Sequence, residues 1–235
     1  METKVHAATT VLAVEPRIAV VGIGGAGCNV VNELYWADGS LDTIAINTDK
    51  NSLRNTRSDR KVCLCKDVTK GEGAKGDTML AERCARAHFS EIRESLEGYD
   101  TVFIIAGMGG GTGTGVAPVV LDAARSLDLI TFMVAIRPFS FESQRTKVAR
   151  EAISKISARC PMTVVIENDK VFSNLPHATM DEAFLMVNRS VVSFIAEKKK
   201  KISEAMIAQL SSIETMIEER NEPHSLSVFA GKMSA

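Results

Sequence analysis

Residues 107–115 are the stretch of this chain best suited to binding an anion, because six glycines and two threonines lie within it. The apolar run 101–105 predicts a buried strand before this stretch, and the apolar periodicity of 116–125 predicts a helix after it. A glycine-rich turn between a strand and a helix exposes backbone N–H groups at the positive end of the helix, and threonine hydroxyls add donors. The pattern therefore predicts a phosphate-binding loop rather than a flexible hinge.

A second candidate phosphate loop lies near the start of the chain. Glycines at the G-x-G-x-x-G spacing, within residues 22–27, follow an apolar strand expected at 17–21 and precede a helix. Dinucleotide-binding folds have this fingerprint and also need an acidic residue after their second strand. The second strand is expected at 41–46, and Asp49 follows it. This part of the chain, taken alone, predicts an NAD-binding Rossmann protein.

The sequence GGGTGTG at 109–115, within the longer AGMGGGTGTG, resembles the signature loop of the tubulin/FtsZ family, and FtsZ more than tubulin. GGAGCN at 24–29 and NTD at 47–49 resemble the first two nucleotide loops of FtsZ. A dinucleotide fold has no need of a second glycine loop, so the resemblance favours GTP or GDP, with Asp49 near the phosphates or their Mg²⁺, and NAD becomes the alternative. The resemblance assigns to phosphate binding Gly24, Gly25, Ala26, Gly27, Cys28, Asn29, Asp49, Gly73, Ala74, Gly109, Gly110, Gly111, Thr112, Gly113 and Thr114.

A third glycine-rich loop, residues 70–77, follows a strand expected at 60–64. It resembles the FtsZ loop that reaches the terminal phosphate and distinguishes GTP from GDP. The family has a small residue after its GxGA sequence, whereas this chain has Lys75. Two interpretations stay open for Lys75: contact with phosphate, or a solvated side chain.

The sequence PFSFE, which begins at Pro138, resembles the FtsZ loop whose glutamate accepts hydrogen bonds from the ribose hydroxyls. The resemblance therefore assigns Pro138 to the site and the ribose contact to Glu142. The family then has an arginine four residues past the glutamate, where this chain has Thr146, and Arg145 is the candidate substitute for its phosphate contact. The alternative is a charged first helical turn, with Glu142 favourable at the positive end of the helix.

Base recognition is expected from Asn168, in a loop that resembles the family's PND, and from a helix over 180–195. FtsZ has there an aromatic residue that stacks on the base and, one turn later, a group that recognises the guanine edge. Phe184 and Asn188 fit that placement. A phenyl ring stacks on any base, so Asn188 is expected to carry the specificity. The alternative for Phe184 is an ordinary core aromatic.

Strands that alternate with helices predict an α/β fold, a Rossmann-like and mostly parallel sheet with helices on both faces, plus a C-terminal amphipathic helix. All the glycine loops follow strands, so they are expected at one edge of the sheet. The predicted organisation is an N-terminal arm (1–16), an FtsZ-like GTP-binding domain (17–196), an amphipathic helix (197–220) and a tail (221–235).

The resemblance ends near residue 196. FtsZ continues there with an N-x-D-x-x-D loop, which supplies acidic residues to the nucleotide of the next subunit, and with a second domain, and neither is expected in this chain. Four lysines, 198–201, take the place of that loop, followed by apolar residues at helical spacing, namely Ile202, Met206, Leu210, Ile213 and Ile217. This helix is expected to pack on the domain or to self-associate; a partner-binding or membrane-surface helix is the alternative.

The composition of the chain excludes several classes of protein. The 235 residues are 45% hydrophobic, which suffices for a core, and the net charge of −1 predicts no nucleic-acid partner. No apolar run is long enough to span a membrane, and five cysteines without zinc-type spacing predict reduced thiols and a cytoplasmic location. The expected function is an FtsZ-like GTP-binding protein of cell division or a related cytoskeletal process, with weak or partner-dependent hydrolysis. The alternatives are a non-hydrolysing regulator or cap of an FtsZ filament and an NAD-binding protein.

Overall fold

The structure is a computed structural model that describes residues 15–175 and 177–221. The chain divides into two compact units, one formed by Pro16–Lys199 and the other by the two terminal parts of the chain. Of the second unit, the structure describes Glu15 and residues 200–221. The first unit, called here the α/β unit, holds every residue that the sequence assigns to a site.

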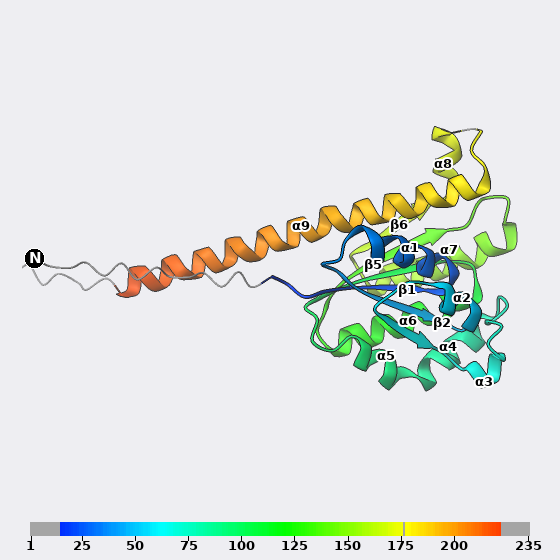
Figure 1. Cartoon of the computed structure of the whole chain (residues 1–235), viewed down its shortest axis with the longest axis horizontal. Coiled ribbons are helices and arrows are strands. Elements are labelled where there is room, and N and C mark those ends of the chain that lie inside the picture. The colour runs from blue at the N-terminus through cyan, green and yellow to red at the C-terminus, as the bar shows by residue number, and fades with distance from the viewer. Residues whose placement is uncertain (1–14, 176, 222–235) are drawn as a thin grey trace, which may run out of the picture. The chain divides into compact units, whose positions relative to one another are not determined.

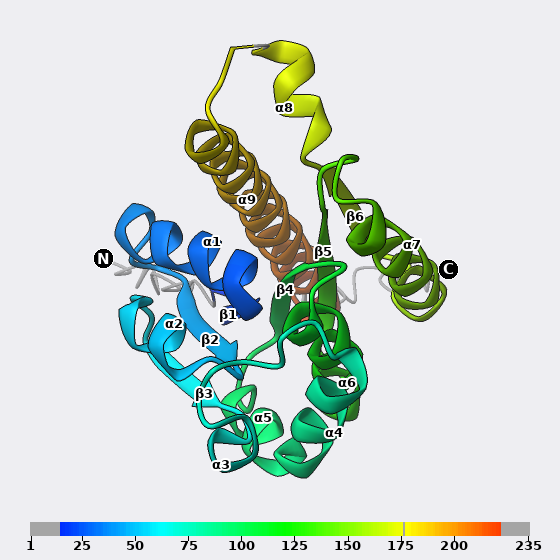
Figure 2. The same ribbon diagram turned by 90° about the vertical axis from the view of Figure 1, so that its right-hand side faces the viewer.

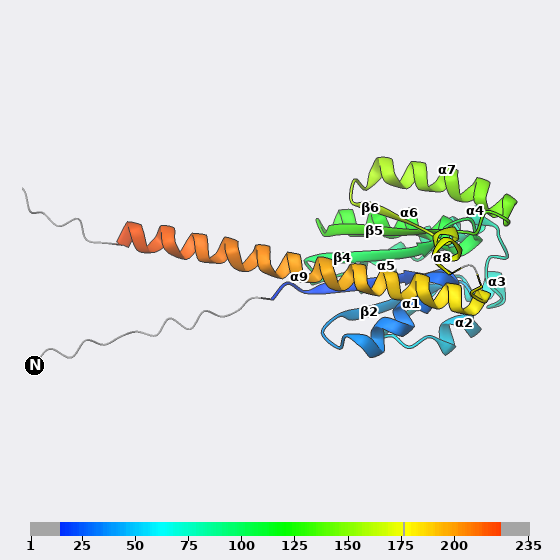
Figure 3. The same ribbon diagram turned by 90° about the horizontal axis from the view of Figure 1, so that it is seen from above.

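One parallel six-stranded sheet forms the centre of the α/β unit, with the strand order β3-β2-β1-β4-β5-β6. Its members are β1 (Ile18–Ile23), β2 (Asp42–Asn47), β3 (Arg60–Cys63), β4 (Thr101–Gly107), β5 (Ile130–Arg137) and β6 (Thr163–Glu167). Figure 2 shows the six strands following one another across the sheet in this order, and Figure 3 shows β2, β4, β5 and β6 in the same sequence from another side. Every residue of β1 is buried, as expected for a central strand covered on both faces.

Helices cover both faces of the sheet, as Figures 1 and 2 show. α1 and the first part of α9 lie on one face, and α4, α5, α6 and α7 lie on the other (Figure 2). The helices of the chain are α1 (Gly24–Ala37), α2 (Lys50–Asn55), α3 (Lys66–Thr69), α4 (Thr78–Ala87), α5 (Phe89–Ser95), α6 (Gly111–Ser126), α7 (Ser143–Arg159), α8 (Asp169–Asn174) and α9 (Met180–Asn221). The predicted α/β class is confirmed.

The strands differ from their predicted bounds by one or two residues, and three helical segments differ by more. The apolar spacing of residues 78–96 predicts one helix. This helix breaks at His88, whose Nε2 accepts a hydrogen bond from the backbone N–H of Cys65 at 3.2 Å. Helix α6 begins at Gly111, five residues before Val116, because the small residues of the signature loop allow a first helical turn against the neighbouring loops. The segments expected as two helices, 180–195 and 197–220, form the single helix α9.

The described part of the second unit, apart from Glu15, is the end of α9. Several of its apolar side chains are exposed, with exposed fractions of 57% for Ile207, 52% for Ile213 and 62% for Met216. Of the predicted stripe, Ile213 is exposed, whereas Ile202, Met206 and Leu210 are half-buried. The side chain of Ile217 lies outside the described residues, as do most of the predicted arm and tail. Among the described helices, none has an apolar stretch sufficient to cross a membrane.

Candidate functional site

Two cavities lie at the carboxyl ends of the strands, where a doubly wound sheet binds its ligand. The first, called here the glycine cavity, has a volume of about 300 Å³. The second, the aromatic cavity, has a volume of about 280 Å³. They adjoin, because both are lined by Gly25, Ala26, Gly107 and Arg145.

The three glycine loops and the loop after β2 form the walls of the glycine cavity. They bring together, from segments far apart in the sequence, residues that the sequence assigns to phosphate binding: Gly24, Gly25, Ala26, Asp49, Gly73, Ala74, Gly110, Gly111, Thr112 and Gly113. Helix α7 adds Arg145, the candidate for a further phosphate contact. Helices α1 and α6 both begin at this cavity, at Gly24 and Gly111. Two helix N-termini with free backbone N–H groups and positive dipole ends suit a polyanion.

The glycines of the first loop have two different roles. A Cβ atom added at Gly25 would meet no described atom within 4 Å, so this residue leaves open space at the junction of the two cavities. A Cβ at Gly27 would lie 2.4 Å from the carbonyl oxygen of Ile105, so Gly27 lets helix α1 approach strand β4. Gly27 therefore serves the packing of the fold, whereas Gly25 keeps the junction of the two cavities open.

Thr48 joins three of the loops and was missed by the sequence analysis. Its hydroxyl lies 2.7 Å from that of Thr112 in the signature loop and accepts a hydrogen bond of 3.1 Å from the backbone N–H of Ala74. Its carbonyl oxygen accepts from the hydroxyl of Thr69 at 3.1 Å. Thr48 is fully buried, so these bonds are shielded from water and fix the loops relative to one another. The signal for it was a hydroxyl residue directly after a strand.

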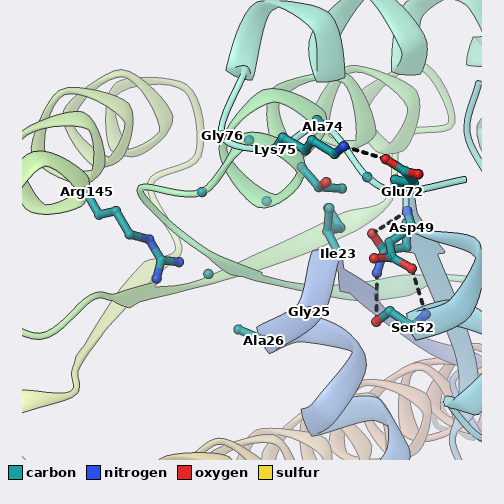
Figure 4. A pocket seen from close by; sticks show the side chains of 18 residues that line it. Ile23, Gly25, Ala26, Asp49, Ser52, Glu72, Ala74, Lys75, Gly76 and Arg145 are labelled. Carbon is teal, nitrogen blue, oxygen red and sulfur yellow. Dashed lines mark hydrogen bonds and ion pairs between the residues drawn. The ribbon is translucent and has the colours of Figure 1, made fainter. Parts of the chain in front are cut away.

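Four charged side chains border the glycine cavity. Figure 4 shows Asp49, Glu72 and Lys75 on one side of it and Arg145 on the other. The Asp49 carboxylate accepts from the backbone N–H of Ser52 at 2.8 Å and so caps helix α2, and Lys75 pairs with Glu72. Arg145 pairs with Glu142 at 2.5 Å, at the junction with the aromatic cavity.

The aromatic cavity collects the residues that the sequence assigns to the ribose and the base. Its walls contain Pro138, Glu142, Asn168, Phe184 and Asn188. They also contain Arg145 and Asn29, which the sequence assigns to phosphate, and Asn29 does not line the glycine cavity. The ring of Phe184 packs edge-on against the buried Phe139, with 5.6 Å between ring centroids, yet 43% of Phe184 is exposed. Phe184 is therefore a ring on the wall of the cavity and not an ordinary core aromatic. One oxygen of Glu142 accepts from the backbone N–H of Phe139 at 3.1 Å.

Two amides in the aromatic cavity have hydrogen-bonding capacity to spare. Asn168 is 5% exposed, and its Oδ1 has no hydrogen-bond partner among the residues that the structure describes. A buried acceptor without a partner costs free energy unless a ligand or water satisfies it. The Nδ2 of Asn188 donates to a carboxylate oxygen of Glu33 on helix α1 at 3.4 Å, which leaves the amide oxygen of Asn188 available. Glu33 was also missed by the sequence analysis.

Four of the predicted residues lie beneath the loops rather than on the cavity walls: Gly27, Cys28, Gly109 and Thr114. The Cys28 thiol is buried, and this burial raises its pKa to about 11. Gly109 has a φ of +91°, and its N–H donates to the Thr114 hydroxyl at 2.8 Å, which braces the signature loop from inside. These residues shape the loops that carry the other groups. The cavity walls also contain residues that the sequence analysis did not assign: Ile23, Asn47, Ser52, Glu72, Lys75, Gly76, Gly107, Met108, Ile136 and Val187.

Within the described residues, no cluster of three or more His, Cys, Asp or Glu side chains could hold a metal ion. Asp49 and Glu72 are the carboxylates of the glycine cavity. Magnesium sites often take one or two carboxylates and complete the shell with phosphate oxygens and water. The residues present therefore fit an ion that arrives with phosphates.

Comparisons with known proteins agree with this geometry. Residues 17–176 match the family described as Tubulin/FtsZ family, GTPase domain. Cell division protein FtsZ 2 of Halobacterium salinarum is 40% identical over 194 residues, which cover 82% of this chain and 48% of that protein. Cell division protein FtsZ 1 of Pyrococcus horikoshii is 37% identical over 184 residues, which cover 77% of this chain and 50% of that protein. The chain thus spans about half the length of these relatives.

Solved structures show the same fold. An empty FtsZ dimer from M. jannaschii superposes with a TM-score of 0.73 at 35% identity, covering 77% of this chain and 53% of that chain. CetZ2 from Haloferax volcanii, described as a GTPγS-bound protofilament, gives a TM-score of 0.71 at 23% identity, covering 78% and 58%, and supports the fold alone. The matched region holds three glycine loops around one cavity, and from this match we conclude that the chain belongs to the tubulin/FtsZ family.

Proposed function

We propose that this chain binds guanine nucleotide, GTP and GDP, with the phosphates in the glycine cavity and the nucleoside in the aromatic cavity. The two helix N-termini and the open space at Gly25 support the placement of the phosphates. Mg²⁺ would accompany the phosphates beside Asp49. The exposed ring of Phe184 supports stacking on the base, and Glu142 and Pro138 border the space between base and phosphates.

The buried and unpartnered Oδ1 of Asn168 is the observation that carries the preference for guanine. The amide nitrogen of Asn188 faces Glu33, so both asparagines have an oxygen left to accept a hydrogen bond. The pairing edge of guanine has two adjacent donors, N1–H and the N2 amino group. That of adenine has one donor beside an acceptor. Two acceptors in one cavity therefore suit guanine better than adenine.

Isothermal titration against GTP, GDP, ATP and NAD tests the proposal. We expect GTP and GDP to bind more tightly than ATP and NAD. Replacing Asn188 by Ala removes one acceptor and is expected to cost about 1–3 kcal/mol of base discrimination, which lowers the guanine-over-adenine preference about 5- to 150-fold. The matched control is Asn51→Ala, which removes an exposed amide in helix α2 that lies outside both cavities.

Tight NAD binding without GTP binding would refute the guanine assignment and favour the dinucleotide alternative. An unchanged base preference in Asn188→Ala would remove Asn188 from base recognition. Equal effects of the Asn188 and Asn51 variants would point to a loss of folded protein instead, and circular dichroism on the same samples separates that case.

We propose that hydrolysis by the isolated chain is weak or depends on a partner. Of the two carboxylates beside the expected terminal phosphate, Asp49 is engaged, because it caps helix α2. Residues 197–221 continue helix α9, at the place where the resemblance to FtsZ implies a loop with catalytic acids. Phosphate release in single-turnover assays, with and without a full-length FtsZ from the same cell, measures the partner's contribution.

A role in cell division or a related cytoskeletal process, as regulator or cap of an FtsZ-type filament, is the second candidate. Its support is the same continuation of α9, which changes the surface that an FtsZ-type subunit would present to its neighbour's nucleotide. A subunit that binds a filament through one face only ends a head-to-tail series. Substoichiometric addition to a full-length FtsZ should then shorten its filaments in electron micrographs. Unchanged filament length, or long protofilaments of this chain alone, would contradict capping. Self-association through residues 197–220 is a separate question, and it would appear as a dimer in sedimentation experiments.

A further inference from the structure

We propose that Lys75 is the ligand of the terminal phosphate in this chain, held by Glu72 while that phosphate is absent and released to it when GTP binds. The inference rests on the proposed function and names the group that distinguishes GTP from GDP. It requires Lys75 to lie at the far end of the phosphate site, on a fixed backbone, with a side chain whose present partner is easily replaced.

The position of Lys75 follows from the two cavities. Gly25, Ala26, Gly107 and Arg145 line both cavities and mark their junction. Lys75 lines the glycine cavity and not the aromatic one, and Figure 4 shows it across the cavity from Arg145. A nucleotide with its base beside Phe184 crosses the junction with its first phosphate and extends toward Lys75 with its last. Of the two nucleotides, GTP reaches further toward the ammonium group.

The backbone of Lys75 is fixed although its side chain is not. The neighbouring Ala74 donates its N–H to the buried hydroxyl of Thr48 at 3.1 Å, and its carbonyl oxygen accepts from Asp77 N–H at 2.8 Å. A Cβ atom added at Gly111 would lie 3.0 Å from the backbone N of Asp77, so the loop packs directly on the start of helix α6. The lysine is thus attached to the same rigid base as the signature loop.

The backbone of Lys75 also has an unfavourable conformation for a lysine. Its φ is +45°, in the left-handed region that glycine occupies at no cost. Neither the fold nor the hydrogen bonds of the loop require a side chain here, since that side chain is 70% exposed. Lys70 has a similar φ outside the cavities, so only the position of Lys75 on the cavity wall connects its strained backbone with a functional site.

The pairing of Lys75 with Glu72 suits an exchange of partners. Both side chains are well exposed, 70% and 60%, and ion pairs between exposed groups contribute little stability. Glu72 stays in place because its backbone forms a bridge with Asp49, and the adjacent Lys50 N–H donates to Gly71 O at 3.0 Å. A phosphate group with nearly two negative charges attracts the ammonium more strongly than one carboxylate does.

Lys75 also offsets a repulsion. Asp49 and Glu72 border the same end of the cavity, so a terminal phosphate without a nearby cation would meet two carboxylates. The Lys75 ammonium offsets the repulsion between these carboxylates and the terminal phosphate. It therefore favours GTP, the nucleotide that has the additional phosphate. The β-phosphate of GDP ends before this point, so GDP affinity is expected to depend little on Lys75.

The experiment compares GTP and GDP affinities of the wild type with Lys75→Met, which keeps the length of the side chain and removes its charge. We expect GTP to bind about 10-fold more weakly, which corresponds to about 1.4 kcal/mol, while GDP affinity stays within twofold. Lys70→Met is the matched control, because Lys70 belongs to the same loop, also has a positive φ of +54°, is exposed and lies outside the cavities. Lys75→Gly removes the charge and the backbone strain together, so it should lower GTP affinity while the melting temperature of the free protein stays equal or rises.

The outcomes are distinct. A loss of GTP affinity in Lys75→Met with GDP unaffected, and neither affected in Lys70→Met, supports the proposal. Equal losses for GTP and GDP, or no loss for either, overturn it while guanine-nucleotide binding by the wild type stands. If the wild type itself binds neither nucleotide, the proposed function fails and this inference fails with it.

Discussion

Gly25 allows a direct test of whether the glycine loop serves a ligand, because folding and binding make opposite demands on the residue at this position. The perturbation is Gly25→Val. A Cβ atom at this position meets no described atom within 4 Å, and Gly25 lies in the first turn of α1 without a positive φ. Because valine is a better helix former than glycine by a few tenths of a kcal/mol, the free energy of unfolding should change by less than about 0.5 kcal/mol.

Binding should respond very differently. Gly25 lines both cavities, so the new side chain would occupy the space where a phosphate approaches the backbone. Losing one hydrogen bond to a charged group costs about 1.5–3 kcal/mol. We therefore expect GTP affinity to fall about 10- to 150-fold, as measured by isothermal titration.

Gly27→Ala is the matched control, two residues away in the same loop. Its Cβ would lie 2.4 Å from the carbonyl oxygen of Ile105, so the helix must shift away from strand β4. Overpacking of this kind costs about 1–3 kcal/mol, and each kcal/mol lowers the melting temperature of a domain of this size by roughly 2–4 °C. Wild-type GTP affinity in Gly25→Val would refute the reasoning, and so would equal melting temperatures of Gly27→Ala and the wild type.

Thr48→Val removes the hydroxyl that contacts Thr112 and Ala74. We therefore expect the free energy of unfolding, measured with urea, to fall by about 1–3 kcal/mol and GTP binding to weaken. Thr48→Ser should retain stability and binding, and a Thr48→Val variant as stable as the wild type would contradict the joining role. For Asp38, burial raises the pKa, but hydrogen bonds from Lys199 and Ser40 outweigh it and the net pKa is lowered. The carboxylate therefore stabilises the fold at neutral pH, and this contribution is lost as the pH falls through the lowered pKa. The stability difference between wild type and Asp38→Asn should accordingly shrink below about pH 4, the ordinary range of an aspartate; a difference independent of pH would exclude the ion pair as its source.

Much of the glycine cavity could be predicted from the sequence, because its parts are local. A strand, a glycine-rich turn and a helix are encoded within about twenty neighbouring residues, and parallel strands bring their carboxyl ends to one edge of the sheet. The loops at 24–29 and 109–115 are therefore recognisable without coordinates. Phe184 and Asn188 could be paired for the same reason, since one helical turn separates them.

The sequence alone is thus enough to predict the order of the elements, the class of the fold and the segments that line the cavities. What each residue contacts there depends on the tertiary structure, because its neighbours in the packing are distant in sequence. Gly25 and Gly27 look alike in the sequence, yet one faces a cavity and the other touches strand β4, 78 positions further on at Ile105. The contacts of Thr48 with Thr112 and of Asn188 with Glu33 span 64 and 155 positions, and no local pattern encodes contacts at that separation.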